Sequence, residues 1–120
     1  MTAQIRKELD QLWKRGTDFL GTKYAILGGA MSWLSESNLV SALSNAGGFG
    51  IIACGSMTPD LLSTVIEETH AKTKKPFGVN LITMHPDIEA LIDVTLAHKV
   101  KYIVLAGGIP TSDSIKRIKD

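Results

Sequence analysis

Four short apolar runs recur along the chain at nearly equal spacing. They begin about 26 residues apart, the length of one strand followed by one crossover helix. Apolar and polar residues do not alternate cleanly within the runs, so both faces of each predicted strand are expected to be covered, as is typical of parallel sheets. The four predicted strands are 24–27, 50–53, 77–81 and 102–105.

The segments between these runs carry helical periodicity and clear helix-start residues. Ser35 or Ser37 can cap a first helix, which Gly47-Gly48 would end. The next helix opens at Thr58-Pro59-Asp60 with a capping hydroxyl, a proline at the first helical position and a carboxylate near the positive helix end. Two further helices are predicted to start at 85–87 and 111–113.

A separate helical pattern precedes the first strand. Ile5, Leu9, Leu12 and Trp13 fall on one helical face, and Gly16 supplies a stop. We expect an amphipathic helix that packs on the outside of the strand–helix region; a partner-binding helix is the less favoured interpretation. The chain then divides into an N-terminal amphipathic helix, 1–20, and four β/α units, 21–120.

The predicted order is one helix followed by four strand–helix units. Two α/β architectures accept it, an open doubly wound sheet and part of a closed (β/α)8 TIM barrel. The repeat of similar-length units without an antiparallel hairpin favours the barrel. Four units leave two sheet edges with unpaired backbone groups. We therefore expect the N-terminal half of a (β/α)8 barrel, with the rest of the barrel following Asp120.

Composition narrows the classes of function. The 120 residues include thirteen Lys and Arg against twelve Asp and Glu, and this net charge of +1 gives no basis for binding nucleic acid or an anionic membrane surface. No apolar run approaches the ~18–20 residues that span a bilayer. A single cysteine, Cys54, and an N-terminus without the apolar stretch of a signal peptide predict a cytoplasmic protein.

In both architectures ligands bind at the carboxyl ends of the strands, so the residues that follow each run form the candidate site. After the first run, the small residues of 28–33 allow a flat ligand to approach the backbone amides, although an ordinary turn is the alternative. Asn80 offers an amide that suits the edge of a heteroaromatic ligand or, alternatively, ties down a loop. Cys54 is interpreted as a buried thiol rather than a nucleophile.

The three histidines show no catalytic or metal-binding pattern. His70 and His98 fall near predicted helix C-terminal ends, where a cation is favourable. His85 lies on a loop at the carboxyl face and is the only one placed for substrate contact. Histidines and carboxylates are scattered without ligand spacing, so no metal site is predicted.

Three segments of the chain carry a family resemblance. Met31-Ser32-Trp33, Leu43–Ala53 and Lys75–Leu81 together resemble the flavin-dependent nitronate monooxygenases (2-nitropropane dioxygenases), which share a fold with flavin-type enoyl-acyl-carrier-protein reductases. The block 44–50 followed by 76–80 is specific in this order and separation, whereas either piece alone is weak. The resemblance covers about residues 24–120, and the N-terminal helix looks like an addition to it.

The resemblance implies an FMN-binding barrel enzyme that oxidises alkyl nitronates with O2. It places Ala30, Met31 and Ser32 beside the flavin ring and gives Asn80 a contact with FMN. In the family the phosphate-binding loops and the proton-abstracting histidine belong to later strands, so no catalytic residue is assigned here and the isolated chain is expected to be inactive. The chain departs from the family at 28–30, where a glutamine and a proline or glycine commonly stand.

Two alternatives stay open. In the enoyl reductase branch, a nicotinamide nucleotide reduces FMN, which then reduces a 2-enoyl thioester. A barrel resembling IMP dehydrogenase would use the same face for a phosphorylated substrate without flavin, and Cys54 is compatible with that. All three interpretations imply a small-molecule substrate and no nucleic-acid or membrane partner, and they leave the oligomeric state open.

Overall fold

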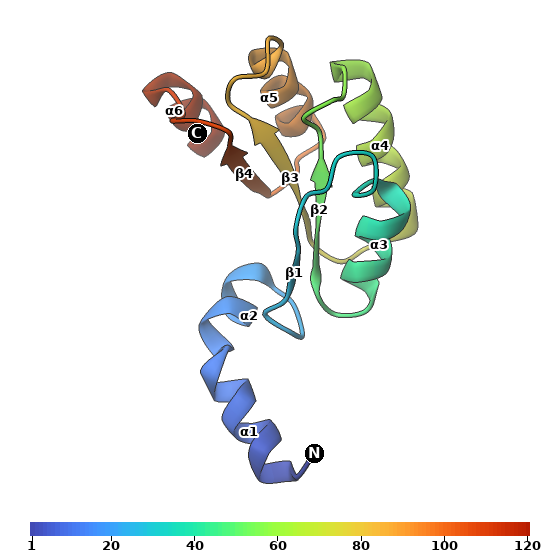
Figure 1. Ribbon diagram of the computed structural model, residues 1–120, viewed down its shortest axis with the longest axis vertical. Coiled ribbons are helices and arrows are strands. Elements are labelled where there is room, and N and C mark those ends of the chain that lie inside the picture. Colours follow the sequence, from blue (N-terminus) through green and yellow to red (C-terminus); the bar gives the residue numbers. More distant parts are fainter.

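The computed structural model describes residues 1–120 and contains one four-stranded parallel sheet with the strand order β1-β2-β3-β4 (Figure 1). A helix follows each strand, and two helices precede the first. The elements are α1 (Ala3–Leu12), α2 (Lys14–Leu20), β1 (Leu27–Gly28), α3 (Ser37–Asn45), β2 (Phe49–Ala53), α4 (Pro59–Lys72), β3 (Phe77–Ile82), α5 (Ile88–Ala97), β4 (Tyr102–Ala106) and α6 (Ser112–Lys119). This confirms the predicted succession of four β/α units.

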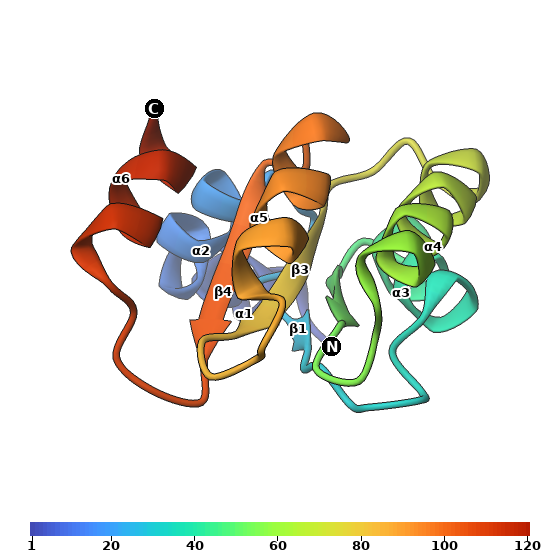
Figure 2. The same cartoon turned by 90° about the horizontal axis from the view of Figure 1, so that it is seen from above.

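The main core lies between the sheet and the helices that follow the strands. Figure 2 shows α3 to α6 succeeding one another around the outside of the strands. Thirteen buried side chains form this core, among them Ile52 and Val79 from the sheet and Leu62, Ile66 and Leu91 from the helices. Because side chains alternate along a strand, the intervening residues point to the opposite face, which we call the inner face.

The inner face is built in rows by the register of the strands. Phe49 pairs with Leu27, Ile51 pairs with Gly78, and Gly78 pairs with Tyr102. A Cβ atom on Gly78 would lie 3.1 Å from the Phe49 ring and 3.2 Å from the carbonyl oxygen of Tyr102. Glycine therefore lets the Phe49 and Tyr102 rings approach edge-to-face, with 5.0 Å between their centroids.

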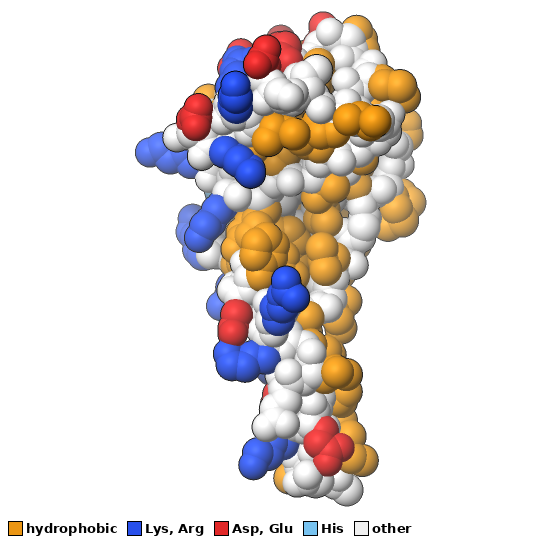
Figure 3. Space-filling model, turned by 90° about the vertical axis from the view of Figure 1, so that its left-hand side faces the viewer, with side chains coloured by type: hydrophobic (Ala, Val, Ile, Leu, Met, Phe, Trp, Pro, Cys, Tyr) orange, Lys and Arg blue, Asp and Glu red, His pale blue; other side chains and the backbone are white.

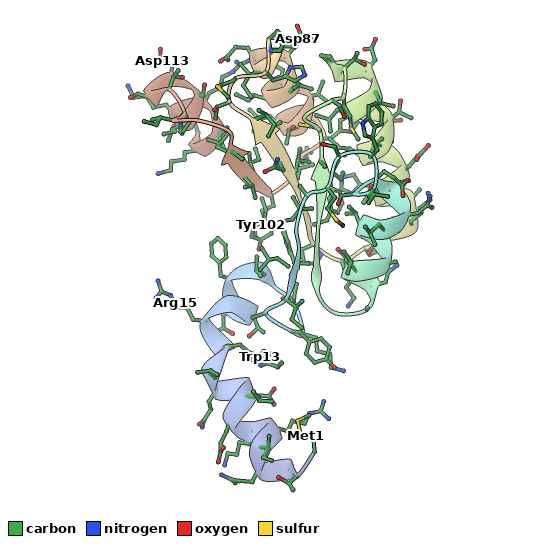
Figure 4. All side chains as sticks on the ribbon, viewed as in Figure 1. Met1, Trp13, Arg15, Asp87, Tyr102 and Asp113 are labelled. Atoms are coloured by element: carbon green, nitrogen blue, oxygen red, sulfur yellow. The ribbon has the colours of Figure 1, made fainter.

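Helix α2 closes the amino end of this face. Leu20 packs in a small cluster with Phe49 and Ile51, and Tyr102 packs against that cluster. The hydroxyl of Tyr102 donates a hydrogen bond to the carbonyl oxygen of Phe19 at 2.8 Å, and the two rings meet edge-to-face. Figure 4 shows Tyr102 between the sheet and α2.

The N-terminal region differs from its prediction. The helix breaks at Trp13, and α1 has no buried residue and projects from the body instead of packing on it (Figure 1). Gly16 lies inside α2 and is not a stop; the helix ends at Gly21, whose φ is +68°. A Cβ on Gly16 would come within 2.8 Å of the Cβ of Ala25, so close packing, rather than a turn, explains this glycine.

The first strand and the first cap also differ from prediction. Strand β1 covers only Leu27–Gly28, because Tyr24 pairs through its N–H with the carbonyl of Gly47 outside the ladder. Glu36, not Ser35 or Ser37, caps α3, and its carboxylate accepts the N–H groups of Asn38 and Leu39. The predicted starts of α4 and α6 are confirmed, since the hydroxyls of Thr58 and Thr111 cap these helices.

Burial of the strands is uneven. All five residues of β2 are buried, as predicted for a strand covered on both faces. Strand β4 is only partly covered, and Val104 on its inner face is 38% exposed. None of the helices has the length and apolar character needed to cross a bilayer.

Candidate functional site

The loop after β1 is held in shape by one buried serine. Ser35 is 3% exposed, and its hydroxyl accepts the N–H of Met31 at 2.9 Å and donates to the carbonyl oxygen of Gly29 at 3.2 Å. The carbonyl of Ser35 in turn accepts the N–H of Ala53 at 3.0 Å. The loop is thereby fixed against the carboxyl end of β2.

This loop presents unpaired donors at the carboxyl face. Within residues 29–33, only the N–H of Met31 makes a hydrogen bond to the chain, so the amides of Ala30 and Ser32 are free to donate to a ligand. Trp33 adopts a φ of +67°, an uncommon conformation for a bulky residue, and its side chain is 75% exposed. The side chain of Met31 is 48% exposed.

Asn80 lies on the inner face near the end of β3, between Ala53 and Val104. Its half-buried side-chain amide makes no hydrogen bond within the chain, so it does not tie down a loop. Ala53 contacts both parts of the predicted site, because it pairs with Asn80 in the sheet and bonds to Ser35 at the base of the β1 loop. The structure therefore brings Ala30, Met31 and Ser32 to the same end of the sheet as Asn80.

Cys54 is a buried structural thiol. It is fully buried in the main core, and its Sγ donates to the carbonyl oxygen of Asn80 at 2.9 Å. Burial raises the pKa of the thiol to about 11. A thiol that stays protonated and faces the helices cannot act as the nucleophile of a site on the inner face.

None of the three histidine side chains makes a hydrogen bond to the loop after β1. His70 stacks edge-to-face on Phe77 at the opposite end of β3, and Nε2 of His98 lies 2.8 Å from the hydroxyl of Ser63 between α4 and α5. His85 does lie on the loop after β3, where its Nδ1 accepts the N–H of Asp87. No group of three or more His, Cys, Asp or Glu side chains is placed to hold a metal ion.

Sequence reasoning missed the role of Ser35, which it took for a helix cap. The only sequence feature that points to a role of Ser35 in the loop is its position between the glycine-rich turn and α3. A serine that caps the helix would stand at the same position. The distinction depends on the fold of the loop, which turns the hydroxyl back toward Gly29 and Met31.

Comparisons with known proteins identify relatives of the chain. The family model for nitronate monooxygenase matches residues 14–120. A nitronate monooxygenase of Paraburkholderia phytofirmans is 38% identical over 64% of this chain and 21% of its own length. A (3aS,4S,5R,7aS)-5-hydroxy-7a-methyl-1-oxo-octahydro-1H-indene-4-carboxyl-CoA dehydrogenase of Mycobacterium tuberculosis is 34% identical over 87% of this chain and 29% of its own.

Solved structures show the same fold. FabK from Thermotoga maritima superposes with a TM-score of 0.83 and 41% identity, over 88% of this chain and 33% of that one. A nitroalkane oxidase from Streptomyces ansochromogenes, at 24% identity and a TM-score of 0.77 over 86% of this chain and 39% of that one, shares the fold alone.

These matches bear on both the architecture and the family. The chain spans less than a third of the length of these curated relatives. The neighbours are TIM barrels, and four parallel β/α units correspond to part of such a barrel, as predicted. The family match begins ten residues earlier than the resemblance in the sequence and includes α2. With the family model covering residues 14–120, the chain belongs to the nitronate monooxygenase family, a family of oxidoreductases.

Proposed function

We propose that this chain forms one side of the cofactor site of an FMN-dependent oxidoreductase that oxidises alkyl nitronates with O2. The proposal rests on hydrogen-bonding groups that lie at the same end of the sheet and have no partner within the chain. They are the backbone amides of Ala30 and Ser32 in the loop after β1 and the side-chain amide of Asn80 near the end of β3. The family match and the curated nitronate monooxygenases support this choice of reaction.

The residues present suit a flavin ring. The isoalloxazine edge carries carbonyl oxygens and ring nitrogens, which need donors, and one N–H, which needs an acceptor. The amides of Ala30 and Ser32 supply donors, while the side chain of Asn80 supplies both a donor and an acceptor. Ala53 and Val104 flank Asn80 with small apolar side chains, which allow a flat ring to lie close to the sheet.

FMN, when bound, accepts the electrons of the substrate, and O2 takes them up. The role of this chain is to bind and orient the ring and to fix its hydrogen-bonding edge. Ser35 acts as a positioning residue, because it holds the Met31 amide and thus the direction of the neighbouring free amides. We assign no catalytic base within residues 1–120, since no histidine side chain makes a hydrogen bond to the loop after β1 and the amide of Asn80 is not a base.

The proposal is tested by FMN binding and oxygen uptake. A protein that carries this chain within a complete barrel is expected to bind FMN and to consume O2 when an alkyl nitronate such as ethyl nitronate is added, whereas residues 1–120 alone are expected to be inactive. Asn80→Ala should weaken FMN binding about tenfold, or ~1.4 kcal/mol, whereas Asn38→Ala on the exposed first turn of α3 should not. A colourless protein that gains no flavin absorbance with added FMN would refute the proposal.

A second candidate is reduction of a 2-enoyl thioester at the same site. It is favoured by the 41% identity to FabK over 88% of this chain and by the relative named as a carboxyl-CoA dehydrogenase. Exposed apolar side chains of Met31, Trp33 and Ile109 around the carboxyl ends suit an acyl chain. NAD(P)H oxidation that depends on the enoyl thioester, without oxygen uptake on nitronate, would select this reaction.

The interpretation as a flavin-free barrel resembling IMP dehydrogenase loses its main support, because Cys54 faces the helices and stays protonated. A cytoplasmic location remains a prediction from the lone thiol and the composition.

A further inference from the structure

A cavity of about 460 Å³ lies at the amino end of the sheet, at the other end from the proposed flavin site. Three segments surround it: the end of α2 at Leu20, the α4–β3 connection up to Phe77, and the α5–β4 connection up to Tyr102. The volume falls within the ~300–1,000 Å³ of small-molecule pockets. Neither the sequence pattern nor the proposed oxidoreductase uses this cavity.

The rim of the cavity is positively charged, and no acidic side chain of the lining neutralises it. Lys74, Lys75, Lys99 and Lys101 line it together with His70, and no carboxylate does. None of these lysines takes part in an ion pair, since the ion pairs of the chain involve Lys14, Arg117 and His98. Four like charges around one concavity favour a ligand that carries several negative charges.

The floor of the cavity is apolar and aromatic. Leu20, Phe77 and Val100 are each 5–7% exposed, and the ring of His70 meets Phe77 edge-to-face at 4.9 Å. Figure 3 shows Lys and Arg side chains beside a hydrophobic patch in the middle of this side of the molecule, between the body and the projecting α1. Such a floor suits an organic body, whereas the lysines suit its anionic groups.

We propose that this cavity binds a small phosphorylated organic anion of nucleotide size, with the phosphates toward the lysines and the organic body against the floor. The concave shape distinguishes such a ligand from a flat acidic protein surface. The inference depends on the geometry of this end of the sheet and not on the oxidoreductase proposal, so the two can fail separately.

The test is titration of the purified protein, without added FMN, with ADP by calorimetry. ADP should bind more tightly than either adenosine or inorganic pyrophosphate, and its affinity should fall as NaCl rises from about 50 to about 500 mM. The double variant Lys74→Ala/Lys101→Ala should lose about tenfold or more in ADP affinity. The matched control, Lys116→Ala/Lys119→Ala on the exposed side of α6, should bind ADP as the parent does.

Three results would overturn the proposal. The first is an absence of ADP binding at about 5 mM, a concentration well above typical ligand affinities. The second is equal ADP affinity in Lys74→Ala/Lys101→Ala and in the control double variant. ADP would then bind at another place, such as the carboxyl end of the sheet. The third is pyrophosphate binding as tight as that of ADP, which would show that the apolar floor is unused. Unchanged thermal unfolding of both double variants establishes that they fold, because all four lysines are exposed.

Discussion

The buried hydroxyl of Ser35 accepts the backbone N–H of Met31 at 2.9 Å, and this contact sets the shape of the loop after β1. The same hydroxyl also donates to the carbonyl of Gly29, so one side chain closes the turn from both ends. The free amides of Ala30 and Ser32 take their direction from this turn.

Replacing Ser35 by alanine should loosen the loop after β1. The N–H of Met31 loses its partner, so we expect about 1–3 kcal/mol lower stability to urea and FMN binding weakened about tenfold. Fluorescence titration with FMN measures the second effect. Ser41→Ala is the matched control, since Ser41 is also buried but bonds only to the carbonyl of Asn38 within its own helix. Equal FMN affinity in the two variants would contradict the role of Ser35.

Adding a methyl group at Gly78 should destabilise the inner face. Its Cβ would press on the Phe49 ring and the Tyr102 carbonyl, which costs about 1–3 kcal/mol by overpacking. Equilibrium urea unfolding of Gly78→Ala measures this loss. Gly29→Ala provides the comparison, because nothing lies within 4 Å of a Cβ there. If both alanines left the unfolding midpoint unchanged, the close packing around Gly78 would be disproved.

The hydroxyl of Tyr102 should tether α2 to the sheet. Tyr102→Phe removes the hydrogen bond to the Phe19 carbonyl and should cost about 1 kcal/mol, with faster amide exchange along α2. Hydrogen exchange read by mass spectrometry localises the change. In Tyr24→Phe no hydroxyl contact is lost, so exchange in α2 should match that of the parent. Unaltered exchange in Tyr102→Phe would show that the apolar contacts alone hold the helix.

Cys54 should be unreactive in the native protein and should impose a pH dependence on stability. Burial raises its folded pKa from 9.0 to about 11, so the unfolded state releases the proton first as pH rises. This contribution to stability is fully present below about pH 9 and is lost between about pH 9 and 11. Urea unfolding across this range should show the decline, and Cys54→Ala should lack it. Rapid labelling of the native thiol by an aromatic disulfide reagent near pH 8 would contradict the burial.

Much of the architecture could be predicted from local patterns. The mainly apolar runs at 50–53, 77–81 and 102–105, without regular polar alternation, indicated parallel strands, and the three structural strands overlap them closely. Thr58 and Thr111 identified their helices because a cap bonds to an amide three residues away, a relationship contained in the sequence itself. Asn80 was found by the same kind of local reasoning, as a polar residue near the end of an apolar strand.

Local patterns along the chain were thus enough for the order of the four β/α units, the family resemblance and the end of the sheet at which a ligand is expected. The folded chain was needed to show that Ser35 shapes the loop rather than capping a helix, that Gly16 serves close packing, and that α1 projects from the body. It also assembled four lysines from two separate connections around one cavity. Helix caps and hydrophobic periodicity depend on interactions between residues a few positions apart, whereas these features depend on contacts between segments that are distant in the sequence and meet only in the fold.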